Sequence, residues 1–186
     1  MRIITGTARG TKLKTLEGLD TRPTTEICKE GVFSAIQFDV QDRTVLDLFG
    51  GCGQMALEAL SRGAESAVII DSSRNACEVI KENAQKAKLM KQCKILTSDW
   101  KEYLRSASGK KTFDLVFLDP PYAEGIIDDV LRKLQEKDVL AKGAIIVAES
   151  DKNGLPKDVE GWNSKLYRYG KSYVTIFRLP EEEEEA

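Results

Sequence analysis

The sequence contains no histidine, and its four cysteines stand far apart with no C-x-x-C pair. This excludes the usual zinc-binding patterns and every Ser-His or Cys-His nucleophile arrangement. Cys28 and Cys77 fall in helical patterns, where a thiol is most simply a small buried hydrophobic group. We therefore expect no bound metal, and any chemistry must rely on carboxylates, on the positioning of reactants or on a cofactor.

Long apolar runs are also missing. None approaches the roughly 18–20 residues that cross a bilayer, and no signal-peptide stretch follows Met1. We expect a cytoplasmic protein with no membrane partner. Neither charge sign dominates, since 28 basic residues face 30 acidic ones. Five of these acids lie in residues 181–186, which we expect to be a disordered tail, and without them the net charge is +3.

Strand and helix patterns alternate from Thr44 onward. The short apolar runs do not alternate with polar residues, which indicates strands buried on both faces of a parallel sheet. A turn at Gly170 within residues 166–177 predicts an antiparallel hairpin at one edge. The predicted strands are 44–48, 66–70, 94–97, 113–118 and 144–148, and the predicted helices are 54–62, 73–88, 100–105 and 126–137. Residues 23–180 thus predict one doubly wound α/β domain.

Residues 1–22 predict a small β-hairpin extension before this domain, with Gly6 and Gly10 around its turn. The extension is basic, which indicates a modest positively charged patch. The alternative is that it is only a solvated edge hairpin. Its basic residues are Arg2, Arg9, Lys12, Lys14 and Arg22, against the acids Glu17 and Asp20. Thr24 or Thr25 then caps a helix in which Ile27, Val32, Phe33 and Ile36 recur at helical spacing.

The segment Asp119-Pro120-Pro121-Tyr122 directly follows the apolar run 113–118. Two consecutive prolines donate no backbone hydrogen bonds, so the strand stops there and the chain stays extended. A carboxylate, a proline carbonyl and an aromatic ring are thus presented at a strand's carboxyl end, where open α/β sheets bind ligands. We interpret them as a cradle for a planar group with an exocyclic amine. The simpler alternative is a turn, with Tyr122 packed on the core.

A glycine-rich loop, Phe49–Gly53, joins the first predicted strand to its helix. Gly51-x-Gly53-x-x-Ala56 satisfies the dinucleotide-binding pattern, and Asp71 ends the next strand where a ribose-binding acid is expected. No Gly-Lys-Ser/Thr follows, so the loop is not a P-loop. Two cofactor classes remain: a nicotinamide dinucleotide and S-adenosylmethionine (SAM).

Acids at the strand ends decide between these cofactors. Asp47 would repel a pyrophosphate but suits the cationic amino-acid end of SAM. Asp99 follows the third strand, where it can accept from an adenine amine with Trp100 near the ring. Each acid alone would be a helix cap, but Asp47, Asp71, Asp99 and Asp119 together indicate one SAM-binding cleft. The predicted cofactor-binding residues are Thr24, Asp47, Phe49, Gly51, Gly53, Asp71, Ser72, Asp99 and Trp100.

The chain resembles the bacterial small-subunit ribosomal RNA guanine-N2 methyltransferases of the RsmD family. The resemblance is carried by Arg2–Gly6, Thr21–Thr25, Asp47–Gly53, Leu57–Ala64 and Asp119–Tyr122. The second and fourth of these segments are more specific than the glycine loop, which many methyltransferases share. The resemblance implies a seven-stranded Rossmann-like methyltransferase sheet, SAM as methyl donor and a guanine of 16S rRNA as substrate.

For this reaction we predict that Asp119 and the Pro120 carbonyl accept hydrogen bonds from the guanine amine, so that its lone pair points at the methyl group. Tyr122 would stack on the target base, which must be unpaired or flipped out to reach the cleft. The candidate contacts to RNA are Arg2, Arg9, Lys12, Lys14, Arg22 and Tyr122. We expect a monomer acting on small-subunit rRNA, free or in a partly assembled subunit.

Three alternatives stay open at this point. The N6 amine of adenine, in RNA or DNA, suits the same cradle as the guanine amine. A nicotinamide-dependent oxidoreductase would use the glycine loop and Asp71 but leaves Asp47 and the Asp-Pro-Pro-Tyr segment unexplained. A non-catalytic RNA-binding module would use the basic extension, yet the strand-end acids would repel a polyanion.

Overall fold

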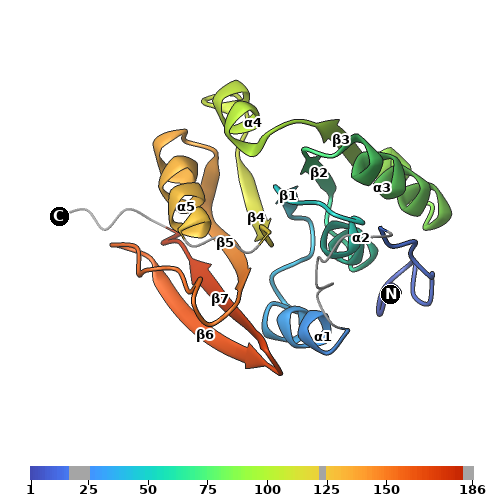
Figure 1. Cartoon of the computed structure of the whole chain (residues 1–186), viewed down its shortest axis with the longest axis horizontal. Helices are drawn as coiled ribbons and strands as arrows, with labels where there is room; N and C mark the ends of the chain where they lie inside the picture. Colours follow the sequence, from blue (N-terminus) through green and yellow to red (C-terminus); the bar gives the residue numbers. More distant parts are fainter. Residues whose placement is uncertain (17–25, 122–124, 182–186) are drawn as a thin grey trace.

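The computed structural model describes residues 1–16, 26–121 and 125–181. Arg22, Thr24, Tyr122 and the predicted tail beyond Glu181 lie outside the described residues. Within those ranges, seven strands form one sheet in the order β3-β2-β1-β4-β5-β7-β6 (Figure 1). The strands are β1 (Thr44–Asp47), β2 (Ser66–Asp71), β3 (Cys93–Thr97), β4 (Phe113–Leu118), β5 (Leu140–Ser150), β6 (Asn163–Tyr169) and β7 (Ser172–Arg178). The helices are α1 (Glu26–Ala35), α2 (Gln54–Ser61), α3 (Arg74–Lys86), α4 (Trp100–Ala107) and α5 (Ile126–Glu136), with a short 3₁₀ turn at Met90–Gln92.

Strand direction follows the expectation from the apolar runs. β1 to β5 pair in parallel, and β7 lies antiparallel between β5 and β6. Gly170, with a φ of +63°, provides the tight turn between β6 and β7. The predicted fold class, a doubly wound and mostly parallel sheet with an antiparallel edge hairpin, is confirmed.

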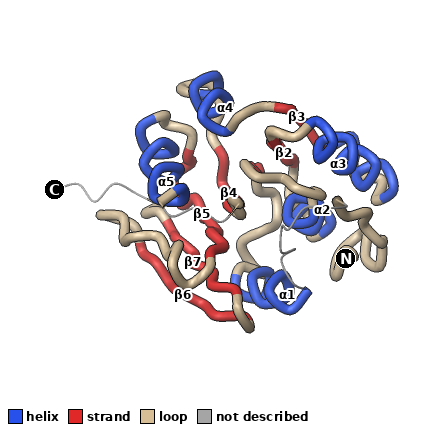
Figure 2. Tube along the Cα trace, viewed as in Figure 1, coloured by secondary structure: helices blue, strands red, loops and turns tan. Residues whose placement is uncertain are grey.

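Helices cover both faces of this sheet (Figure 2). Because successive strand residues point to opposite faces, each strand contributes to two apolar layers. Val45, Ile69 and Phe117 belong to the layer under α1, α2 and α3, called here the α1–α3 layer. Leu46 and Val116 belong to the layer under α4 and α5, the α4–α5 layer. Both layers end at the carboxyl ends of β1 to β5, where the polar residues begin.

β5 is longer at both ends than the predicted run 144–148. It starts at Leu140, which pairs with Phe113 ahead of an irregularity in the β4–β5 register. It continues to Ser150 because Glu149 and Ser150 pair with β7. This antiparallel pairing connects segments that are distant in the sequence, so the local apolar pattern carried no sign of it. The extension places Glu149 at the end of a central strand.

α1 buries Val32 and Phe33 as expected, and Ile36 just beyond it is buried too, but the first turn of the helix differs from the prediction. Ile27 is 71% exposed, while Cys28, Lys29 and Phe33 are fully buried. The Lys29 ammonium can occupy this face because its Nζ donates to the Arg2 carbonyl at 2.6 Å and lies 3.7 Å from Glu58 Oε2. A buried charge is tolerated only when it is paired in this way, which periodicity alone cannot reveal.

The N-terminal arm, residues 1–14, folds back on itself around Gly6 and Gly10. Its antiparallel pairing amounts to a bridge between Arg2 and Lys12, with backbone hydrogen bonds from Ile3 to Thr11 and from Gly10 to Ile3. It is therefore a shorter hairpin than the pattern predicted. The division into units 1–22, 23–180 and 181–186 stays a prediction.

Buried polar groups on α2 attach the arm to the domain. The Glu58 carboxylate, with no exposed surface, accepts from the Ile4 and Thr5 amides at 2.8 and 3.0 Å and from Arg62 Nε at 2.8 Å. Ser61 Oγ donates to the Thr5 carbonyl at 2.6 Å and accepts from the Ala8 amide at 2.9 Å. The segment Leu57–Ala64 is thus a docking site for the arm.

Candidate active site

The glycine loop bends over the carboxyl ends of β1 and β2. Gly51 and Gly53 have φ values of +56° and +81°, a conformation that side chains disfavour, and Gly53 precedes the first turn of α2. A Cβ on Gly51 would meet nothing closer than the Phe49 carbonyl at 4.0 Å. The loop therefore presents an open backbone surface to a ligand at the start of a helix.

Asp71 holds this loop in place from the end of β2. Its Oδ2 accepts from the Gly51 amide at 2.9 Å, and its Oδ1 accepts from the Ser73 amide at 2.8 Å. Ser72 between them is exposed. Each carboxylate oxygen has a second lone pair, so Asp71 can brace the loop and still accept from a ribose hydroxyl.

Asp47, at the end of β1, is a buried carboxylate with little compensation. It is 3% exposed, and its Oδ1 accepts from the Phe49 amide at 3.3 Å. Burial, with a smaller contribution from the charge of Asp71, raises the pKa of Asp47 to about 7 despite hydrogen bonds from the Phe49 and Ala56 amides. A ligand ammonium beside Asp47 would relieve this desolvation.

Asp99 and Trp100 follow β3, the edge strand on the other side of β2 from β1. Asp99 is exposed and caps α4, with its Oδ1 accepting from the Lys101 amide at 2.8 Å. Trp100 and Phe49 are partly buried against the α4–α5 layer. The capping alternative therefore holds for Asp99, and a contact to adenine would use its other oxygen.

Asp119 and Pro120 lie directly beyond β4, as the sequence predicted. Asp119 is partly exposed and Pro120 is buried. Because β4 pairs with β1 in parallel through Asp47 and Phe117, Asp119 ends the strand next to the glycine loop. The chain leaves β1 toward β2 and leaves β4 toward β5, so the loop and Asp119 flank the point where the strand order reverses.

The strand-end acids follow the spatial order of the strands. Across β3, β2, β1, β4 and β5 the order is Asp99, Asp71, Asp47, Asp119 and Glu149. Glu149 was not among the predicted site residues. The same signal, an acid that follows an apolar strand, was available here, because Glu149 directly follows the predicted strand 144–148. In the structure β5 continues through Glu149 to Ser150.

Two further polar residues near the site were missed. Asn83 on α3 is 1% exposed and donates through Nδ2 to the carbonyls of Lys14 and Cys52, both at 2.9 Å. Its Oδ1 accepts from the Lys14 amide at 2.8 Å. Asn83 therefore joins the N-terminal arm to the glycine loop. Gln54, at the start of α2, holds a buried Oε1 that lacks a hydrogen-bond partner among the described residues.

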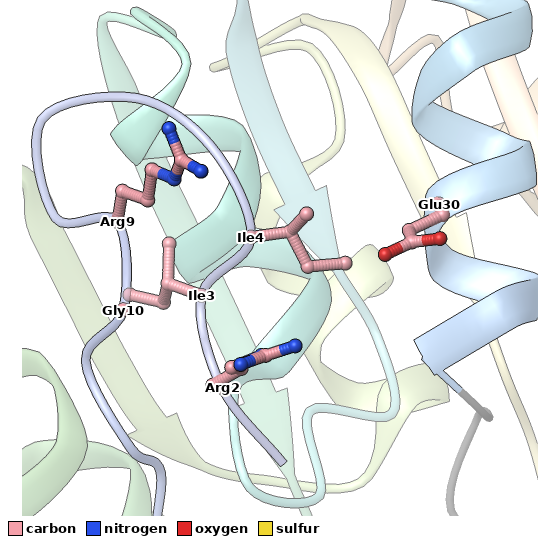
Figure 3. A pocket seen from close by; sticks show the side chains of 6 residues that line it. All are labelled: Arg2, Ile3, Ile4, Arg9, Gly10 and Glu30. Carbon is pink, nitrogen blue, oxygen red and sulfur yellow. The ribbon is translucent and has the colours of Figure 1, made fainter.

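The predicted RNA-binding residues Arg2, Arg9, Lys12 and Lys14 are all exposed on the arm. Arg2 Nε lies 3.7 Å from Glu26 Oε2, and Lys14 Nζ lies 2.9 Å from Glu82 Oε2. A hollow of about 220 Å³ opens between the arm and α1 (Figure 3). Its lining residues are Arg2, Ile3, Ile4, Arg9, Gly10 and Glu30.

Clustered metal ligands and membrane-spanning helices are both absent from the described part of the chain. In that part, no group of three or more Cys, Asp or Glu side chains is placed to hold a metal ion. Among the same residues, no helix is both long and apolar enough to cross a membrane.

Comparison with known proteins identifies the family. The family model described as Conserved hypothetical protein 95 matches residues 1–178. The chain belongs to this family, the RsmD family of methyltransferases. It is 35% identical over 181 residues to YlbH of Bacillus subtilis, covering 96% of this chain and 98% of that protein. It is 32% identical over 184 residues to ribosomal RNA small subunit methyltransferase D of Escherichia coli K12, covering 98% and 90%.

Solved structures agree with the family assignment. That of yhhF from Escherichia coli superposes with a TM-score of 0.86 at 30% identity, covering 98% of this chain and 99% of that one. An RNA methyltransferase from Salinibacter ruber in complex with S-adenosyl-L-homocysteine has the same fold, with a TM-score of 0.65 at 20% identity, covering 88% and 97%. The family favours methyl transfer over the nicotinamide-dependent and non-catalytic alternatives.

Proposed function

We propose that this protein transfers the methyl group of SAM to the exocyclic N2 amine of a guanine in small-subunit ribosomal RNA. The observation that carries the proposal is the pairing of two acidic groups across the point where the strand order reverses. Asp47 and Asp71 lie on the glycine-loop side, and Asp119 with the Pro120 carbonyl lies on the other. This arrangement supports the proposal that a cationic donor and a planar amine bind in one cleft.

The residues on the loop side fit SAM. The ammonium of its methionine part would pair with Asp47, a carboxylate whose burial costs free energy until a cation arrives. Asp71 would accept from the ribose hydroxyls, and Asp99 with Trp100 would hold the adenine. The open backbone at Gly51 adds polar surface to the same cradle. When bound, SAM supplies an electrophilic methyl group.

The residues on the other side fit a nucleobase amine. A guanine N2 lone pair is delocalised into the ring, so the amine is a poor nucleophile unless its geometry is changed. Asp119 and the Pro120 carbonyl would accept its two N–H groups and turn the lone pair toward the methyl group. Holding the two reactants in this way can lower the barrier by about 7–11 kcal/mol. Tyr122, outside the described residues, keeps its predicted role of stacking on the flipped base.

RNA would be held at a distance from this cleft by the N-terminal arm. Arg2, Arg9, Lys12 and Lys14 form an exposed basic surface suited to phosphates. The rigid docking of the arm on Glu58 and Ser61 fixes this surface relative to the domain. The substrate is then rRNA, free or in a partly assembled small subunit, and a monomer contains every group that the proposal uses.

Replacing Asp119 with alanine tests this proposal. Asp119→Ala should reduce methylation of small-subunit rRNA by about 10²- to 10³-fold, since one transition-state contact is lost. The dissociation constant for S-adenosylhomocysteine, measured by calorimetry, should stay within about twofold, because the loop side is unchanged. Asp114→Ala is unsuitable as a control because Asp114 binds Thr44. Asp158, between β5 and β6, is exposed and accepts only a solvent-exposed hydrogen bond from Ser164 Oγ among the described residues, so Asp158→Ala is the control instead.

Nucleoside mass spectrometry of the product identifies the acceptor. N2-methylguanosine is the expected product, and its yield should fall in Asp119→Ala but not in Asp158→Ala. Formation of N6-methyladenosine would replace the guanine assignment by the adenine one while retaining the cleft. Full activity of Asp119→Ala would overturn the mechanism.

A further inference from the structure

Glu149 is the acid of the strand-end row to which no role has been given. In the parallel β4–β5 pair, Leu118 is aligned with Ala148. Asp119 is the residue after β4 and Glu149 is the next residue of β5, so the two lie side by side at the carboxyl end of β4. Neighbouring strands lie about 4.8 Å apart, which brings the two carboxyl groups within reach of one small planar ligand.

The side chain of Glu149 lies on the same face of the sheet as Asp119. Ile145 and Val147 belong to the α1–α3 layer, and Glu149 follows them at the strand period of two. Phe117 belongs to the same layer two residues before Asp119. Glu149 is 7% exposed, so it ends at the rim of the buried layer rather than in open solvent.

Cys28 on α1 provides an independent indication that the two acids converge. Burial raises the pKa of its thiol, and the charges of Glu149 and Asp119 and a hydrogen bond with Glu149 raise it further. One thiol therefore lies near both carboxylates. A thiol is a weak donor, so it can orient the Glu149 carboxylate without neutralising it.

Two adjacent acceptors match the Watson–Crick edge of guanine and not that of adenine. Guanine presents two neighbouring donors, N1–H and N2–H. Adenine presents its N6 amine next to N1, which is an acceptor without hydrogen. An ionised carboxylate that faces adenine N1 would bring two hydrogen-bond acceptors together. Both groups would then be buried without a donor, which costs binding free energy.

We propose that Glu149 accepts the N1–H of the target guanine while Asp119 accepts from its N2 amine, which makes Glu149 the residue that selects guanine over adenine. The inference rests on the proposed function, because it requires a nucleobase amine at Asp119. It adds a second contact, on β5, to the base-binding half of the cleft, and it gives a physical reason for the guanine assignment that Asp119-Pro120 alone does not provide.

A substrate change tests this contact without altering the protein. The guanine that the wild type methylates would be replaced, in reconstituted small-subunit RNA, by 2,6-diaminopurine. This base keeps the N2 amine but has an acceptor at N1. The wild-type kcat/KM should fall by at least about 100-fold on this substrate. Equal rates on the two substrates would overturn the inference, while the wild type's activity on guanine leaves the proposed function intact.

The variant Glu149→Gln gives the complementary test, because a glutamine amide can donate to an acceptor at N1. Its activity on guanine should fall by about 10- to 100-fold, and its ratio of diaminopurine to guanine activity should rise by at least about 100-fold. Affinity for S-adenosylhomocysteine should be unchanged. A purely structural role would lower both activities equally and would contradict the inference. Glu160→Gln, an exposed glutamate before β6, is the matched control and should leave both activities unchanged.

Discussion

Two buried carboxylates, Glu58 and Asp47, show how differently this chain compensates for the burial of an acid. Glu58 has no exposed surface, yet it accepts from two backbone amides and Arg62, and Lys29 Nζ lies 3.7 Å away. Asp47 is 3% exposed and has a long 3.3 Å hydrogen bond from Phe49, with its pKa raised to about 7. The protein's own groups satisfy the hydrogen-bonding capacity of the Glu58 carboxylate. The Asp47 carboxylate is less well compensated, and under the proposed function a ligand cation would supply the missing partner.

We expect the largest change in stability at Glu58, where the buried carboxylate is fully paired. Glu58→Ala should lower the free energy of unfolding by about 3–5 kcal/mol, because it leaves Lys29 buried without its counter-charge. Urea titration followed by circular dichroism measures this loss. Glu136→Ala is the control, since the exposed Glu136 also pairs with two cations, Arg132 and Lys133, but in solvent. If the two variants were equally stable, the arm would not depend on the buried network.

Substitution of Asp47 should instead increase the free energy of unfolding. Since its folded-state pKa lies above its ordinary value of 3.8, the folded protein binds more protons than the unfolded one between about pH 4 and 7, and stability falls as the pH rises through this window. Asp47→Asn removes that cost and should stabilise the protein by up to about 4 kcal/mol at pH 8 and hardly at all at pH 4. Unfolding curves at both pH values test this.

The same substitution should weaken the binding of SAM by about 10- to 100-fold at pH 8, through loss of a charged hydrogen bond. In the wild type, SAM affinity should rise from pH 6 to pH 8 as Asp47 ionises. Calorimetry across this range gives both results. An unchanged affinity in Asp47→Asn would show that the ammonium binds elsewhere.

A smaller effect separates two glycines of the N-terminal arm. Gly6 and Gly10 share similar φ values, +87° and +83°, but a Cβ on Gly6 would lie 1.7 Å from the Ser61 carbonyl oxygen, while nothing lies within 4 Å of one on Gly10. Gly6→Ala should cost about 2–3 kcal/mol and Gly10→Ala about 1 kcal/mol. Thermal unfolding of the two variants measures the difference. Equal losses would mean that the arm is not docked on Ser61.

Much of the site was predictable because its chemistry is local in sequence. A carboxylate that follows an apolar run is placed at a strand end by the strand itself, so Asp47, Asp71, Asp99 and Asp119 could be assigned from the sequence pattern alone. Pairing partners were not predictable. The burial of Lys29 depends on Glu58 and on Arg2, which lie 29 residues after it and 27 before it. Periodicity therefore favoured Ile27, which is exposed.

Glu149 could have been assigned to a strand end in the same way, because it directly follows the predicted strand 144–148, but the continuation of β5 past it could not be predicted. The end of β5 is set by its pairing with β7, a strand whose register no local pattern specifies. Asn83 likewise lies within a regular helix, and only the meeting of α3 with the arm and the loop gives its amide three partners. Local sequence patterns do not reveal residues whose role depends on contacts with distant segments of the chain.

The sequence alone determined the alternation of buried strands and helices, the turn at Gly170 and the acids at the strand ends, because each depends on hydrophobic periodicity or backbone stereochemistry within a few residues. The tertiary structure decided which acids are satisfied and which remain in need of a partner. Burial and hydrogen bonding depend on segments that are distant in sequence, and they separate Glu58, which fastens the arm, from Asp47, whose pKa is raised by burial.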